Sequence, residues 1–194
     1  MTVDDAALDA VFRNARTARR WTTRPVAEAT LRAAYDLWKL GPTSGNCCPA
    51  RIVFVASEAG KEKLRPCLIP SNVEKTMTAP VTAVIGHDLE FYEYLPRLYP
   101  FEDARSWFAG NQPLIDATAF RNGTLQGAYL MLACRSLGLD CGPMSGFDNA
   151  KVDSAFFAGA SVRSNFLCNI GYGDRTGLAP RSPRLDFEEA CRFA

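Results

Sequence analysis

Histidine is nearly absent from this chain, and its cysteines lack metal-binding spacing. The 194 residues include one histidine and seven cysteines, with no Cys-x-x-Cys pair. A zinc site needs several closely spaced Cys or His ligands, and a Ser or Cys nucleophile normally needs a His base. His87 ends an apolar run, so we expect a packed or rim residue, no metal site and no hydrolase. The odd set of cysteines is expected to remain as thiols in a reducing compartment.

The chain also lacks an excess of either positive or negative charge, and it lacks long apolar runs. Lys and Arg number 22 against 21 Asp and Glu, which leaves neither a basic face for nucleic acid nor an acidic tail. No segment approaches the ~20 apolar residues of a membrane span, and the first residues lack the pattern of a signal peptide. We therefore expect a cytoplasmic protein that acts on a small molecule, with no nucleic acid and no membrane as partner.

Nucleotide-binding fingerprints are missing as well. The chain has no G-x-G-x-x-G and no P-loop, and Gly171-Tyr172-Gly173 leads to Asp174-Arg175-Thr176-Gly177 rather than into a helix. A nicotinamide cofactor, if one is used, is therefore expected to bind transiently and outside a Rossmann fold.

The apolar content, 47%, is enough for the core of one domain over residues 1–194. Periodicity and turn signals predict helices and strands in mixed order. The expected helices are 5–14, 28–40, 58–68, 114–137, one opened by Asp148 and a last one from Phe187; the expected strands are 51–56, 80–86, 140–144 and 165–171. Because strict βαβ alternation is missing, we expect an α+β sandwich with a central, mostly antiparallel sheet flanked by helices.

The composition of two segments predicts their structural roles more specifically. Residues 89–112 are rich in aromatic residues, Pro and Gly without a clean period, which is typical of an irregular excursion that covers a site. Helix 114–137 has small residues such as Ala119, Gly123 and Gly127 on one face, which favours a closely packed core or dimer helix.

The segment Gly41 to Arg51 has the composition of a ligand loop. It reads Gly-Pro-Thr-Ser-Gly-Asn-Cys-Cys-Pro-Ala-Arg between an expected helix and an expected strand. Pro42 ends the helix, while Thr43, Ser44 and Asn46 offer short hydrogen-bonding groups. Such a loop also occurs as a plain connector, so on its own it is only a candidate.

This loop resembles the Pro-Ser-x-x-Asn-x-Gln-Pro signature of the nitroreductase family of flavin enzymes, with Cys48 in place of the usual Gln. Four further segments resemble family motifs in the same order. They are Ala15–Trp21, a phosphate motif whose first Arg is replaced by Ala15, then Asn72–Lys75, Gly138–Asp148, and the pair Arg181 and Arg184. Over roughly residues 13 to 190 the chain is identified as a member of that family.

The resemblance implies an FMN cofactor with NADPH or NADH as the hydride donor. It implies that Asn72 recognises the imide edge of the flavin, that Lys75 and Arg19 supply positive charge near N1 and O2, and that the Ser145-Gly146 backbone approaches N5. Lys75, Ser145 and Gly146 are the candidate catalytic groups. The residues implied in FMN binding are Arg16, Thr17, Arg19, Pro42, Thr43, Ser44, Asn46, Asn72, Lys75, Pro143, Ser145, Gly146, Arg181 and Arg184.

Longer strings, among them Asp103–Phe108 and Pro143–Asp148, are similar to the malonic semialdehyde reductase branch of the family, which is associated with pyrimidine breakdown. The resemblance implies ping-pong reduction of malonic semialdehyde to 3-hydroxypropionate by a homodimer with FMN at its interface. Candidate substrate contacts are Arg105, Arg121, Trp107 and Phe108. Two alternatives stay open, a broad nitro or quinone reductase and a non-catalytic flavin-binding protein.

Overall fold

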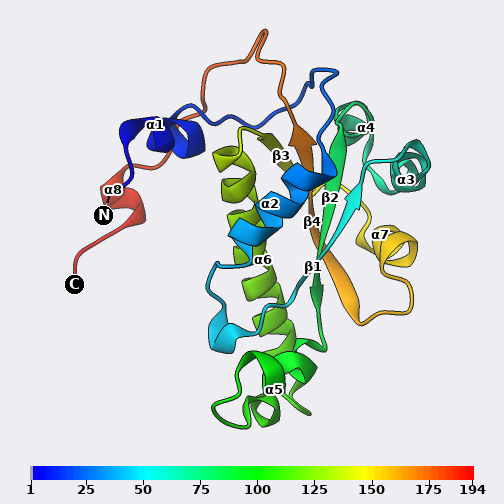
Figure 1. Ribbon diagram of the computed structural model, residues 1–194, viewed down its shortest axis with the longest axis vertical. Helices are drawn as coiled ribbons and strands as arrows, with labels where there is room; N and C mark the ends of the chain where they lie inside the picture. Colours follow the sequence, from blue (N-terminus) through cyan, green and yellow to red (C-terminus); the bar gives the residue numbers. More distant parts are fainter. Residues whose placement is uncertain (1) are drawn as a thin grey trace.

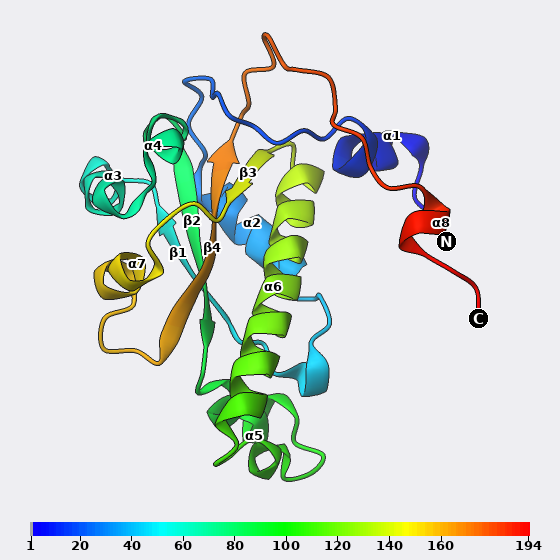
Figure 2. The same ribbon diagram turned by 180° about the vertical axis from the view of Figure 1, so that it is seen from behind.

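The computed structural model describes residues 2–194, and its centre is a four-stranded sheet (Figures 1 and 2). Across the sheet the order is β1, β2, β4, β3, and each neighbouring pair is antiparallel. The strands are β1 (Ala50–Val55), β2 (Val81–Asp88), β3 (Asp140–Met144) and β4 (Val162–Gly171). Helices lie on both faces, so the predicted α+β fold with an antiparallel central sheet is confirmed.

Within residues 2–194 there are eight α-helices and five shorter helical turns. The helices are α1 (Asp5–Leu8), α2 (Glu28–Trp38), α3 (Glu58–Leu64), α4 (Pro70–Met77), α5 (Leu95–Leu98), α6 (Gln112–Ser136), α7 (Asn149–Phe156) and α8 (Phe187–Ala190). The turns are η1 (Asp9–Arg13), η2 (Ser44–Asn46), η3 (Arg65–Cys67), η4 (Phe91–Tyr94) and η5 (Ala104–Trp107). None of these helices has the length and apolar character that crossing a membrane requires.

Two cores cover the two faces of the sheet. Helices α2 and α6 bury apolar side chains such as Leu31 and Leu130 against one face, while α3 and α7 bury Leu64 and Val152 against the other. Helix α6 lies close to the sheet because its buried face is narrow. A Cβ atom on Gly127 would come within 2.5 Å of the Phe166 ring, so a larger residue would push the helix away. The predicted close-packing face of this helix is confirmed.

The sequence patterns missed helix α4. Its buried positions are the polar residues Asn72 and Thr76, so it has no apolar stripe at helical spacing. Pro70 at its first turn was the available signal, since proline is favoured there. The excursion 89–112 is built from short turns around its own cluster, which includes Phe91, Leu95 and Phe108.

The two ends of the chain meet beside β3. Helix α1 and the segment after β4 lie together in both views (Figures 1 and 2), and hydrogen bonds join Arg181 to the carbonyls of Arg13 and Ala15. Residues 178–190 run outward from there along the edge of the molecule to the exposed helix α8. This meeting of distant segments creates the site described next.

Candidate active site

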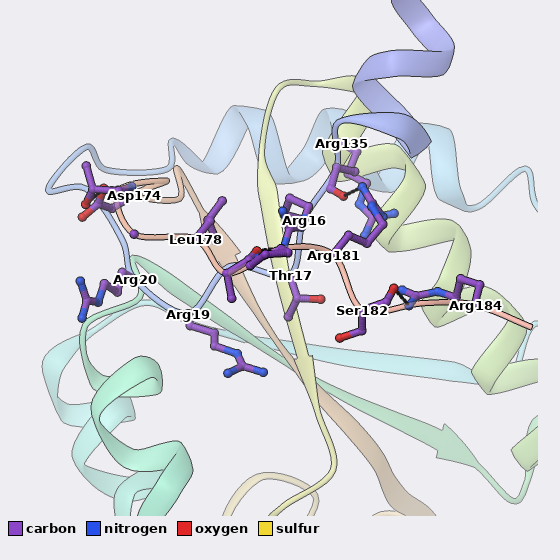
Figure 3. A pocket seen from close by; sticks show the side chains of 15 residues that line it. Arg16, Thr17, Arg19, Arg20, Arg135, Asp174, Leu178, Arg181, Ser182 and Arg184 are labelled. Atoms are coloured by element: carbon purple, nitrogen blue, oxygen red, sulfur yellow. Dashed lines mark hydrogen bonds between the residues drawn. The ribbon is translucent and has the colours of Figure 1, made fainter.

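A basic cavity of about 430 Å³ lies between residues 15–20 and residues 174–184 (Figure 3). Its only carboxylate among the described residues is Asp174, which accepts hydrogen bonds from the amide and hydroxyl of Thr176 at 2.9 and 2.7 Å. The arginines that line it are Arg16, Arg19, Arg20, Arg135, Arg181 and Arg184. Such an excess of guanidinium groups suits an anion that accepts several hydrogen bonds, such as a phosphate.

Residues 15–18 are held in place by strand β3. Ala18 donates its amide hydrogen to the carbonyl of Cys141 at 2.9 Å, and Thr17 forms a parallel bridge with the same residue. Gly142 has no room for a side chain, because a Cβ there would lie 2.5 Å from the carbonyl oxygen of Ala18. The segment that carries Arg16 and Arg19 is therefore fixed by the sheet.

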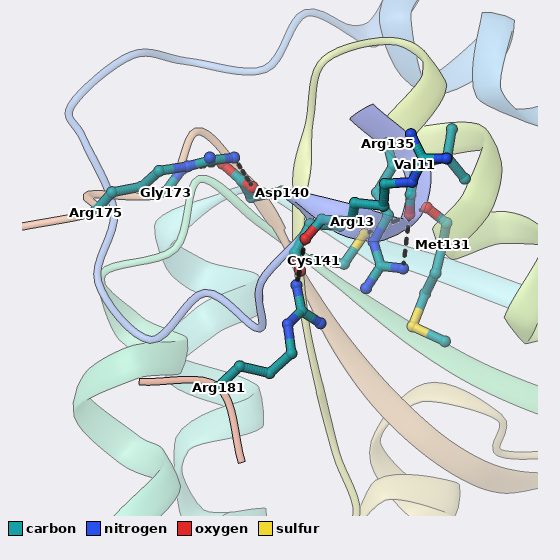
Figure 4. Close-up of polar contacts among 10 residues, drawn as sticks. Val11, Arg13, Met131, Arg135, Asp140, Cys141, Gly173, Arg175 and Arg181 are labelled. Atoms are coloured by element: carbon teal, nitrogen blue, oxygen red, sulfur yellow. Dashed lines mark hydrogen bonds and ion pairs between the residues drawn. The ribbon is translucent and has the colours of Figure 1, made fainter. Parts of the chain in front are cut away.

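The C-terminal segment is clamped to the N-terminal one by reciprocal hydrogen bonds. Arg181 donates to the carbonyls of Arg13 and Ala15 at 2.7 and 2.8 Å (Figure 4). Arg16 in turn donates to the carbonyl of Ala179 at 2.6 Å. Among the described residues, Arg184 bonds only to the neighbouring carbonyls of Ser182 and Pro183. The structure thus brings the predicted phosphate residues together from the two ends of the chain.

Arg135 is a cavity residue that the sequence analysis missed. It lies in the last turn of α6, where its guanidinium donates to the carbonyl of Val11 at 3.3 Å (Figure 4). Ala15, which replaces the first Arg of the family motif, is only 6% exposed. A basic residue in the last turn of a long helix was the available signal, but helix C-termini favour cations in any case.

Helix α4 and the turn after β3 form a second part of the candidate site. Asn72 donates from Nδ2 to the carbonyl of Gly146 at 2.8 Å, and no described residue donates to its Oδ1. A Cβ on Gly146 would lie 2.7 Å from Asn72 Nδ2, so a larger residue there would displace the Asn72 side chain. Ser145 is exposed beside it, and Pro143 is paired with Cys168 in the sheet. The predicted residues Asn72, Pro143, Ser145 and Gly146 are therefore neighbours.

Lys75 is half-buried in the last turn of α4 and forms no ion pair with any residue from 2 to 194. Burial lowers the pKa of its ammonium, and the positive charge of Arg19 lowers it further. Two cations that repel each other without a carboxylate between them are stabilised by a bound anion or by an electron-rich ligand atom.

The loop after α2 is rigidly held. Ser44 donates its amide hydrogen to Asn122 Oδ1 at 2.9 Å, Asn46 donates from Nδ2 to the carbonyl of Leu98 at 2.8 Å, and Thr43 Oγ1 accepts from the amide of Cys48 at 3.1 Å. Asn46 and Cys48 have φ angles of 51° and 41°, which side chains rarely adopt. Backbone held in this way is typical of a binding loop.

The two cysteines of this loop differ. Cys47 is buried, and burial raises the pKa of its thiol to about 12, so it is not a nucleophile. Cys48, at the position of the family's Gln, lies with its Sγ 3.4 Å from Asn46 Oδ1. It therefore closes the loop on itself.

The loop does not meet the basic cavity within one chain. It is bonded to Asn122, whereas Arg135 lines the cavity, and thirteen residues of α6 separate them, or roughly 20 Å at the helical rise. The predicted FMN residues of the loop are therefore separate from those that line the basic cavity. The loop group is Pro42, Thr43, Ser44 and Asn46, in the segment between α2 and β1.

The predicted substrate residues have different environments. Arg105 forms two hydrogen bonds with the carboxylate of Glu93, at 2.8 and 2.7 Å, and Phe108 is buried in the excursion. Trp107 is 42% exposed and lies near Gly45, and Arg121 is exposed on α6. Arg121 and Trp107 are thus open to a ligand, while Glu93 neutralises Arg105 and Phe108 has a packing role. No group of three or more His, Cys, Asp or Glu side chains within residues 2–194 is placed to hold a metal ion.

Comparison with known proteins shows the family of this chain. The model of the nitroreductase family matches residues 12–172. A Burkholderia lata protein with the provisional name NADH dehydrogenase/NAD(P)H nitroreductase is 60% identical over 192 residues, covering 99% of this chain and 98% of its own. A Cupriavidus pinatubonensis protein with the same provisional name is 58% identical over 190 residues, covering 96% and 97%. The chain belongs to the nitroreductase family.

A solved structure has the same fold. It is a protein from Exiguobacterium sibiricum, provisionally described as a nitroreductase and crystallised in complex with FMN. The two chains superpose with a TM-score of 0.82 at 20% identity, covering 100% of this chain and 99% of the other. This likeness extends over the whole chain.

Proposed function

We propose that this protein is an FMN-dependent NAD(P)H oxidoreductase. The observation that carries the proposal is the cavity in which six arginines from the two chain ends and α6 face a single carboxylate. FMN ends in a phosphate dianion, which needs cations and hydrogen-bond donors, and this donor set fits it. Family membership and the FMN found in the E. sibiricum protein support the same cofactor.

The chain's own residues have distinct tasks in this proposal. Arg16, Arg181 and Arg184 bind the phosphate, while Asn72 holds the turn at Gly146 and leaves Oδ1 free to accept from the flavin. Bound FMN supplies reversible hydride acceptance at its N5 atom. Lys75 provides positive charge where the reduced ring accumulates negative charge, which lowers the barrier to hydride arrival. No side chain is required as a nucleophile.

A homodimer with FMN at its interface completes the site. The loop and the basic cavity lie roughly 20 Å apart along α6, so a partner's loop is needed to bring both groups to one flavin. The exposed face near the loop is apolar, since Leu40 is 76% exposed and Leu125 and Tyr129 are also open. Monomers rarely expose such a surface, and a second copy would cover it.

For the substrate we propose malonic semialdehyde, reduced to 3-hydroxypropionate. Its carboxylate needs a cation, and Arg121 is an exposed arginine of α6 without an ion pair shorter than 4 Å to any residue from 2 to 194. A broad nitroreductase is the second candidate, because the B. lata and C. pinatubonensis proteins carry that provisional name. A flavin-binding protein without turnover is the third.

One stopped-flow experiment separates these functions. The FMN-loaded protein is first reduced by NADPH in the absence of oxygen and then mixed with malonic semialdehyde, a nitroaromatic or a quinone. We expect NADPH to bleach the flavin absorbance rapidly. Of the three second substrates, malonic semialdehyde is expected to reoxidise the flavin fastest. Faster reoxidation by the nitroaromatic or quinone would instead support the broad reductase, and bleaching slower than about one event per minute would support the non-catalytic protein.

A further inference from the structure

Lys61 on α3 is a buried lysine without a counter-ion. The residue is 5% exposed, and no carboxylate within residues 2–194 pairs with it. The ammonium instead donates to the carbonyl of Thr76 and to Thr82 Oγ1, each at 2.7 Å. Burial lowers the pKa of Lys61 to about 8, so the fold holds this charge at a cost in stability. The role of Lys61 therefore depends on the groups to which its ammonium is hydrogen-bonded.

What Lys61 holds is the C-terminal end of α4. The last carbonyls of a helix have no partner within the helix, and a cation there is favoured by the helix dipole. Thr76 O accepts from Lys61, while Lys75 O accepts from Trp21 Nε1 at 2.9 Å and from Asn169 Nδ2 at 3.0 Å. Side chains from three other parts of the chain therefore fix the turn that carries Lys75.

Lys61 also sets the direction of a buried hydrogen-bond chain. An ammonium group can only donate, so Thr82 Oγ1 accepts from it and donates its own hydrogen to Asn169 Oδ1 at 2.7 Å. Asn169 Nδ2 then donates to Thr76 Oγ1 at 3.4 Å, and Thr76 donates to Met144 Sδ at 3.5 Å. Met144 is the residue before the Ser145-Gly146 turn, so the hydrogen-bond chain links α4 to the turn after β3.

We propose that Lys61 is a positioning residue for hydride transfer, which fixes the last turn of α4 and thereby the backbone that carries Lys75. This proposal rests on the proposed function, because it assigns Lys75 to the flavin. Lys61 is buried where α3 packs against α4 and β2, and it acts through Thr76, Thr82 and Asn169 rather than by contact with the cofactor.

The position of α4 is tested by amide hydrogen exchange. In Lys61→Met the side chain keeps its length but loses its donors, so amides 72–77 should exchange at least about fivefold faster while those of β2 change little. Lys63→Met is the matched control, because Lys63 lies on the same helix and is exposed. Unchanged exchange in α4 would overturn the positioning role, whether or not the protein proves to be a reductase.

The chemical consequence is tested by a double-mutant cycle on the FMN-loaded protein. Lys61→Met is expected to slow reduction of FMN by NADPH roughly tenfold and to shift the flavin midpoint potential in the same direction as Lys75→Met. In the Lys75→Met background the same change should slow reduction less than about twofold, because its effect passes through Lys75. A merely structural lysine would give independent, multiplicative effects, which would refute the proposal.

Thr82→Val provides a second variant if Lys61→Met does not fold. It keeps Lys61 and most of the volume but breaks the link from Lys61 to Asn169. Thr82→Val should slow the reduction of FMN less than Lys61→Met does, and this slowing should again largely disappear in the Lys75→Met background. Effects of Thr82→Val and Lys75→Met that multiply independently would overturn the proposal. A Lys75→Met protein reduced at the wild-type rate, with faster α4 exchange in Lys61→Met, would refute the proposed role of Lys75 and leave the positioning of α4 standing.

Discussion

The guanidinium of Arg181 donates a 2.8 Å hydrogen bond to the carbonyl of Ala15, a residue 166 positions earlier in the chain. This bond closes the basic cavity, because it ties the last arginines to the segment that carries Arg16. The anion pocket therefore exists only when both ends of the chain are in place, and it is the part of the site most easily tested.

Replacing Arg181 by Ala should weaken FMN binding. The change removes a cavity cation and two hydrogen bonds to the N-terminal segment. Loss of a charged hydrogen bond of about 1.5–3 kcal/mol raises the FMN dissociation constant by roughly 10- to 150-fold, which fluorescence titration of the apoprotein would measure. Arg32→Ala, on the exposed face of α2, is the control. Equal affinity in both variants would contradict an anion site here.

Replacing Lys75 by Met should slow the reduction of FMN by NADPH and lower the flavin midpoint potential. A barrier increase of about 1–3 kcal/mol is expected for the loss of one charged group at such a site. Stability should change by less than about 0.5 kcal/mol, because Lys75 makes no ion pair with the described residues. Stopped-flow reduction and a redox titration measure the two effects. If the variant with FMN fully bound is reduced at the wild-type rate, Lys75 has no role in hydride transfer.

The stability of the protein should depend on pH through Lys61. Its pKa is lowered from 10.5 to about 8, so between these values the unfolded chain binds more protons than the folded one, and stability rises with pH. Below pH 8 Lys61 is protonated in both the folded and the unfolded chain, so burial of its charge lowers the free energy of unfolding by the full amount. The stability of wild type relative to Lys61→Met should increase by about 1–3 kcal/mol from pH 7.5 to 10, as measured by urea denaturation. A difference that is independent of pH would show that Lys61 is not held as described.

Replacing Leu125 by Glu should dissociate the proposed dimer and release FMN. Leu125 lies on the exposed apolar face of α6, and a charge buried there against a second copy would lack a partner. Light scattering and the absorbance of retained flavin report the two effects. Ala150→Glu, on α7 at the opposite face of the sheet, should change neither. A stable wild-type monomer with bound FMN would refute the shared site.

Local sequence signals were sufficient for much of the fold. Strand β3 was predicted at its observed bounds, 140–144, and the predicted N-cap Asp148 accepts a hydrogen bond from the amide of Lys151 at 3.1 Å. Caps, turns and alternating apolar residues depend on neighbours a few positions away, so the order of residues is enough to recognise them. The ordered motifs likewise identified the family before any contact was known.

Only the tertiary structure decided which of these residues meet. It placed Arg135 in the anion cavity, separated the loop of Ser44 from that cavity, and buried Lys61 beneath the candidate site. Helix α4 was missed by the sequence patterns because its buried residues Asn72 and Thr76 are polar and form hydrogen bonds with partners distant in sequence. The physical reason is the same in each case. A buried polar group is stabilised by hydrogen bonds to groups remote in sequence, and the spacing of apolar residues does not predict which groups these are.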